Sequence, residues 1–131
     1  VCGTDPFRLM PLFLKEVQAA GFSGDDLQLV IPALVLAEAG YMIGSRLGPG
    51  AESAFFAAVA GMDVEAPAPE DFTRIGELIA SYADWPLGGV DASIAATAER
   101  LRTRTIVTFD RRHFGALRSA SGDAFDLLPA R

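Results

Sequence analysis

Short apolar segments with strand character alternate with segments of helical periodicity, and this alternation is what most restricts the fold. Thr105–Phe109 is the clearest strand, because it consists of β-branched and aromatic residues. The pattern favours an α/β sandwich with a mostly parallel sheet. The expected strands are 27–31, 64–66, 105–109 and 125–128; the expected helices are 7–20, 33–46, 51–60, 69–83 and 90–101, with a short helix or a loop at 113–121.

Length and composition are those of one globular domain that spans residues 1–131. The chain has 131 residues, of which 50% are hydrophobic and 21% charged. A single cysteine, Cys2, rules out a disulfide framework and fits a reducing cytoplasm. No apolar run is long enough for a membrane span and no signal peptide is visible, so we expect a cytoplasmic protein without a membrane partner.

Charge is unevenly spread along the chain. The net charge of −6 argues against a general nucleic-acid coat protein, which would be basic. Between Glu99 and Arg118, however, six arginines face two acids, which makes this segment +4 and leaves −10 for the rest. Such a basic patch would hold a phosphate backbone locally. The alternative is that these charges form a solvated helix end and loop.

Three acids stand in unusually apolar settings. Glu38 lies in the middle of the expected helix 33–46, Asp91 opens the expected helix 90–101, and Asp110 directly follows the strand 105–109. Parallel sheets place ligands at the carboxyl ends of their strands. Because burying a carboxylate is costly and three carboxylates repel one another, we expect them to share a cation.

A ligand set of carboxylate oxygens that contains no cysteine favours Mg²⁺ or Mn²⁺ as that cation. The chemistry that such a cation supports is in-line hydrolysis of a phosphodiester. Each acid also has a purely structural alternative. Asp91 would serve as a helix N-cap, and Asp110 would open a loop through an Asx turn. Glu38 is the hardest to explain in this way, because an acid among Ala, Leu and Val is expected to be buried.

Three segments resemble a known family. PALVLAE (32–38), VDASIAATAERL (90–101) and TRTIVTFDRRHF (103–114) are similar to the second, third and fourth motifs of VapC-type PIN-domain ribonucleases. The spacings of 53 residues from Glu38 to Asp91 and 19 from Asp91 to Asp110 are typical of it. The resemblance covers residues 29–131 and implies a PIN-like three-layer α/β/α sandwich.

The resemblance also implies an activity and its residues. The activity is that of a toxin: Mg²⁺-dependent cleavage of RNA by a homodimer that a cognate antitoxin neutralises. Glu38, Asp91 and Asp110 become the catalytic, metal-binding acids. Thr108 adds a hydroxyl near the site. An exposed basic turn of Arg111, Arg112 and His113 suits RNA phosphates.

The chain departs from the family pattern at its first motif, an apolar strand that ends in aspartate. Asp5 lies 33 residues before Glu38, near the expected gap, but Val1–Thr4 is too short and polar for a central strand. We therefore expect a domain truncated at its N-terminus, without its first strand. This departure supports a second hypothesis, an inert PIN module that binds antitoxin or RNA without cleavage. A flavodoxin-like ligand-binding domain shares the alternation but would need a glycine-rich loop after its first strand.

Overall fold

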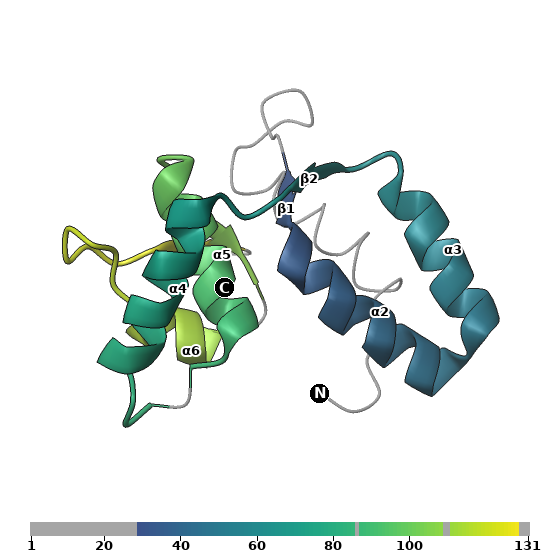
Figure 1. Ribbon diagram of the computed structural model, residues 1–131, viewed down its shortest axis with the longest axis horizontal. Helices are drawn as coiled ribbons and strands as arrows, with labels where there is room; N and C mark the ends of the chain where they lie inside the picture. The colour runs from purple at the N-terminus through teal and green to yellow at the C-terminus, as the bar shows by residue number, and fades with distance from the viewer. Residues whose placement is uncertain (1–28, 86, 109–110, 129–131) are drawn as a thin grey trace.

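A computed structural model describes residues 29–85, 87–108 and 111–128. Asp5, the expected helix 7–20 and Asp110 fall outside these residues, and so does the part of the chain to which the expectation of a truncated first strand refers. Within these residues, nine elements follow one another in the order shown in Figure 1. They are β1 (Val30–Pro32), α2 (Ala33–Leu47), α3 (Pro49–Val59), β2 (Asp63–Glu65), α4 (Pro69–Ser81), α5 (Gly89–Arg100), β3 (Thr105–Val107), α6 (Arg111–Ala116) and β4 (Asp126–Leu128).

The strands pair in parallel, which confirms the expected α/β fold. Within the described residues they form two ladders, β1 with β2 and β3 with β4. The register places Ile31 opposite Val64 in the first ladder and Ile106 opposite Leu127 in the second. One further hydrogen bond, 2.8 Å from the N–H of Thr108 to the carbonyl of Leu128, continues the second ladder beyond β3.

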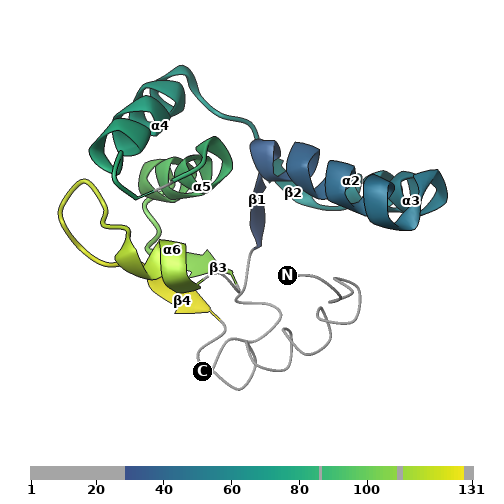
Figure 2. The same ribbon diagram turned by 90° about the horizontal axis from the view of Figure 1, so that it is seen from below.

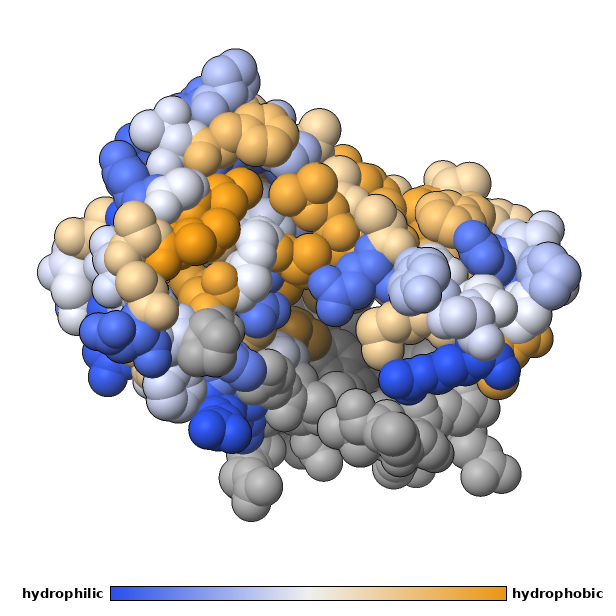
Figure 3. Space-filling model, turned by 60° about the horizontal axis from the view of Figure 1, so that its bottom comes forward, coloured by the Kyte–Doolittle hydropathy of each residue, from blue (hydrophilic) through white to orange (hydrophobic). Residues whose placement is uncertain are grey.

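Helices α2 and α3 form a hairpin that extends to one side of the molecule (Figure 1). Gly48 joins them with a φ of 89°, which only glycine adopts readily. Gly40 lets the helices approach closely, because a Cβ there would stand 2.7 Å from the ring of Phe56. No residue of α3 is fully buried, and apolar side chains reach the surface here, Tyr41 with 75% exposure. Figure 3 shows such apolar surface on one face of the molecule.

The core lies around α5. Its alanines are all buried, and Ala92 and Ala95 have no exposed surface. Helix α4 covers one side of α5, while α2, β1 and β3 pack on its other sides. Phe114 of α6 and Leu117, directly after this helix, complete the same core. The small side chains of α5 allow these neighbours to approach it from several directions at once.

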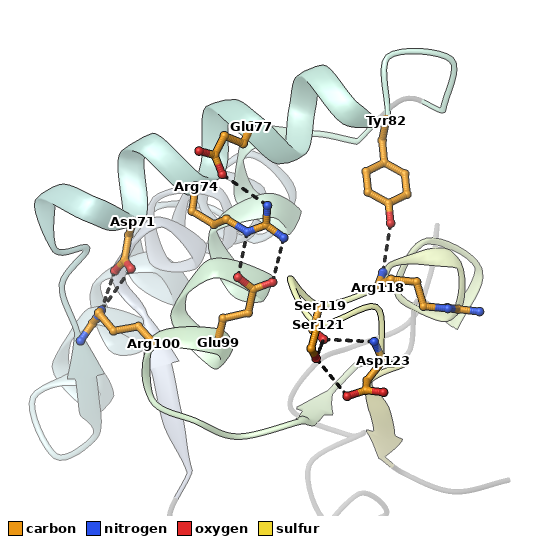
Figure 4. A network of polar contacts seen from close by, with 10 residues as sticks. All are labelled: Asp71, Arg74, Glu77, Tyr82, Glu99, Arg100, Arg118, Ser119, Ser121 and Asp123. Carbon is orange, nitrogen blue, oxygen red and sulfur yellow. Dashed lines mark hydrogen bonds and ion pairs between the residues drawn. The ribbon is translucent and has the colours of Figure 1, made fainter.

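Ion pairs fasten α4 to α5 (Figure 4). Asp71, which is 3% exposed, accepts a 2.9 Å hydrogen bond from Nε of Arg100, and Arg100 also pairs with Glu65 at the end of β2. A turn further along α4, Nε of Arg74 lies 2.8 Å from Glu99. The hydrogen bonds with Glu99 and with Asp71 raise the pKa of Arg74 and of Arg100, respectively. Each carboxylate thus stabilises the charged form of an arginine on the neighbouring helix.

Candidate active site

Glu38 lies in the second turn of α2, which begins directly after β1. Its side chain is exposed, so the expectation that it would be buried is wrong. The physical reason is that α2 is covered only partly: Gly40 and Ile43 are its only buried residues. A hydrated carboxylate at this position can still ligate a cation, because Mg²⁺ retains several of its own waters.

Asp91 is the third residue of α5 and is half-buried. Gly88, which has no side chain to offer, is the N-cap of this helix. The N-cap alternative for Asp91 is therefore wrong. A carboxylate in the first turn also lies at the positive end of the helix dipole, which favours its charged form.

The segment before Asp110 is attached to the second strand ladder as far as Thr108. Thr108 is half-buried, and its backbone is tied to β4 by the hydrogen bond to Leu128. Asp110 follows two residues later and lies outside the described residues. Its role as a ligand, and the Asx-turn alternative, therefore stay predictions.

The elements that carry the predicted acids come together. Helices α2 and α5 pack against each other, and α5 also contacts β3 (Figure 2). In residues 29–85, 87–108 and 111–128, no three His, Cys, Asp or Glu residues are grouped to hold a metal. The predicted set includes Asp110, so the convergence of its three carboxylates stays a prediction. As a donor set, three carboxylates fit Mg²⁺ or Mn²⁺.

Fewer arginines of the basic segment 99–118 are available to a ligand than the sequence indicates. Arg100 pairs with Asp71 and Glu65, and Arg104 lies 3.7 Å from Asp126, so two of the six arginines face carboxylates of the chain itself. Arg111 and Arg112 are exposed in the first turn of α6, as expected. His113 is half-buried rather than exposed, because its ring packs edge-on against Trp85.

Trp85 is a neighbour of this site that the sequence analysis missed. Its ring contacts Arg112 and His113, although it lies in the connection between α4 and α5. The available signal was its place: it is the only tryptophan of the chain and stands six residues before Asp91.

The described helices include none long and apolar enough to cross a bilayer.

Comparison with known proteins places these features in context. A family model described as PIN domain matches residues 13–118, which include Glu38, Asp91 and Asp110. Ribonuclease VapC26 of Mycobacterium tuberculosis (strain ATCC 25618 / H37Rv) is 36% identical over 103 residues. The aligned region covers 77% of this chain and 76% of that protein.

Proposed function

Because this chain belongs to the PIN-domain family, we propose that it is a metal-dependent endoribonuclease and the toxin of a toxin–antitoxin pair. The name of its relative, a ribonuclease, supports the activity. The structural observation that carries the proposal is the packing of α2, with Glu38, against α5, with Asp91. Asp110 would complete the site from the end of the β3 segment.

The three acids would hold Mg²⁺ or Mn²⁺. The bound cation supplies an activated water and stabilises charge on the phosphate oxygens. The arginines of α6, Arg111 and Arg112, would contact phosphates of the RNA rather than the cation, because guanidinium groups bind phosphate. Thr108 and His113 lie next to these groups in the chain and add polar contacts to the RNA.

The partners and the compartment complete the proposal. On the basis of the family resemblance, the protein forms a homodimer in the cytoplasm, and a separately encoded antitoxin protein blocks cleavage. Sedimentation velocity of the purified chain tests the dimer; a monomer at all concentrations would contradict it.

Asp91→Asn tests the nuclease. Asparagine keeps the shape of the side chain but removes the charge that holds a cation, so cleavage of single-stranded RNA with Mg²⁺ or Mn²⁺ should fall by orders of magnitude. Without metal, stability should change little, by about 0.3–1 kcal/mol for the lost interaction with the helix dipole. Cleavage is followed on labelled RNA and stability by thermal unfolding.

Glu70→Gln is the matched control. Glu70 is an exposed acid in the first turn of α4, so its substitution removes a similar dipole interaction far along the chain from the site. This variant should cut RNA at the wild-type rate. Cleavage at the wild-type rate by the Asp91→Asn protein would contradict the assignment of Asp91 to the metal site. A wild-type protein that binds RNA without cutting it would support the inert module instead.

A further inference from the structure

The connection between α4 and α5 holds the beginning of α6 through an aromatic side chain. Cζ of Arg112 lies 5.4 Å from the centre of the Trp85 ring, a distance at which a cation is attracted to the ring face. The rings of Trp85 and His113 meet edge-on, with centroids 5.8 Å apart and an interplanar angle of 68°. One side chain thus touches two successive residues of the basic first turn.

A second contact fixes the other end of α6. The backbone N–H of Arg118, two residues after the helix, donates a 3.0 Å hydrogen bond to the hydroxyl of Tyr82 (Figure 4). Tyr82 is also tied to Trp85, whose backbone N–H donates to the Tyr82 carbonyl over 2.9 Å. The short segment 82–85 therefore holds α6 at both ends, and the same connection continues into the first turn of α5 with Asp91.

The charge on Arg112 is not neutralised within the described part of the chain. Arg112 is exposed and its guanidinium lies over the ring of Trp85, without an ion pair to a carboxylate of the described residues. Arg74 and Arg100, in contrast, face carboxylates. A cation held over a ring keeps its N–H donors for an anion. Because an arginine side chain loses rotamer freedom when it binds, a pre-ordered guanidinium binds phosphate at a lower entropic cost.

We propose that Trp85 is a positioning residue for RNA, which orders Arg112 and His113 so that they receive the phosphate backbone of a single strand. The inference rests on the proposed function for its substrate class. It does not depend on cleavage, because ordering of the basic side chains affects binding. Failure of either proposal can therefore be recognised separately.

Trp85→Leu tests this role, with Trp85→Phe as the conservative variant. Leucine keeps an apolar side chain but removes the ring, so the Kd for a single-stranded RNA measured in EDTA should rise about two- to fivefold, the scale of one exposed cation–π contact. With metal, KM should rise and kcat should stay unchanged. Phenylalanine should restore most of the binding, since the indole Nε1 has no hydrogen-bond partner in the described part of the chain. Phe72→Leu, at an exposed aromatic on α4, is the control for a general loss of ring surface.

A double-mutant cycle with Arg112→Ala shows whether Trp85 acts through the arginine. Arg112→Ala should reduce the salt slope of binding by about 0.7, the value for one phosphate contact on a single strand. If Trp85 orders Arg112, the losses from the two substitutions are less than additive. Additive losses, or a Trp85→Leu protein that binds RNA like the wild type, would overturn the proposal.

The intrinsic fluorescence of Trp85 gives a test that needs no substitution. It is the only tryptophan, so its emission reports on this position alone. Addition of RNA in EDTA should change the emission of the wild-type protein, and the change should be smaller in Arg112→Ala. Unchanged emission at an RNA concentration that saturates binding would contradict the placement of RNA at this cluster. Binding with changed emission but without cleavage would leave this inference standing while the nuclease proposal fails.

Discussion

Side-chain size decides how closely the neighbours of α5 can approach it. Ala92 and Ala95 have no exposed surface, and Ser93 is only 1% exposed. The buried Ser93 hydroxyl is satisfied because it donates a 2.6 Å hydrogen bond to the carbonyl of Val90. Protein interiors are packed as densely as organic crystals, so these positions leave no room for longer side chains. These small buried side chains thus determine where α5 lies relative to its neighbours, and therefore where Asp91 lies.

Ala95→Leu should destabilise the protein. Three additional carbons in a filled core force the surrounding side chains off their preferred rotamers, at a cost of about 1–3 kcal/mol. Urea unfolding followed by circular dichroism measures this change. Ala80→Leu places the same side chain at an exposed position of α4, where about 0.5 kcal/mol or less is expected. Equal stability of Ala95→Leu and wild type would mean that the core around α5 is looser than its burial indicates.

Individual residues also show where prediction from the sequence stops. Glu38 and Asp91 could be selected because acids within apolar helices are unusual. The argument that Glu38 is buried failed, since the exposure of α2 depends on which helices pack against it. Trp85 was missed for the same reason, because its contacts with Arg112 and His113 join residues about 28 positions apart in the chain.

At the scale of elements, the expected boundaries hold best where proline or glycine marks them. Helix α4 begins at Pro69, as expected, and α2 is followed by Gly48. The expectation of a short helix or a loop at 113–121 is the least accurate, because α6 already begins at Arg111 and ends at Ala116. After it the chain forms a turn, held by hydrogen bonds among Ser119, Ser121 and Asp123, that local propensity does not separate from a helix. The division of the described strands into two ladders could not be predicted either, since strand order depends on contacts far apart in the chain.

One buried carboxylate joins three elements. Asp71 accepts a 2.9 Å hydrogen bond from the backbone N–H of Ala68 and thereby caps the start of α4. The same carboxylate binds Arg100 near the end of α5, and Arg100 reaches Glu65 in β2. A buried ion pair is not strongly stabilising by itself, but its disruption leaves an uncompensated charge. We therefore expect Asp71 to be more sensitive to substitution than the exposed pairs of α4.

Asp71→Ala should lower the free energy of unfolding by about 3 kcal/mol, because both the helix cap and a buried partner are lost. Asp71→Asn should lose less, since an amide oxygen still caps α4. Glu77→Ala is the control: its carboxylate is 58% exposed and lies 3.4 Å from Arg74, so a change of about 0.5 kcal/mol or less is expected. Denaturant titration of the three variants gives the order. If Glu77→Ala proved as damaging as Asp71→Ala, burial would not be the factor that distinguishes them.

At the scale of the whole molecule, the described elements form two groups. The hairpin of α2 and α3 with β1 and β2 lies on one side, and α4, α5, α6, β3 and β4 lie on the other (Figure 1). Contacts of α5 with α2 and β1, and the ion pair of Arg100 with Glu65 in β2, connect them. Glu38 belongs to the first group and Asp91 to the second. A cation ligated by both would therefore fasten the two groups to each other.

Metal binding should accordingly stabilise the entire fold. A ligand that binds only the folded state stabilises it by about 2.7 kcal/mol at a concentration of one hundred times its Kd, so the melting temperature should rise with Mn²⁺ or Mg²⁺ and return to its initial value in EDTA. Asp91→Asn and Glu38→Gln should each abolish most of this rise, although the two residues lie in different groups of elements. Asp126→Asn is the matched control, because this acid on β4 is 66% exposed and pairs only weakly with Arg104. Thermal unfolding monitored across a metal titration measures all four proteins. A rise that persists in Asp91→Asn or in Glu38→Gln would remove that residue from the site, and the cation would then not join the two halves of the molecule through it.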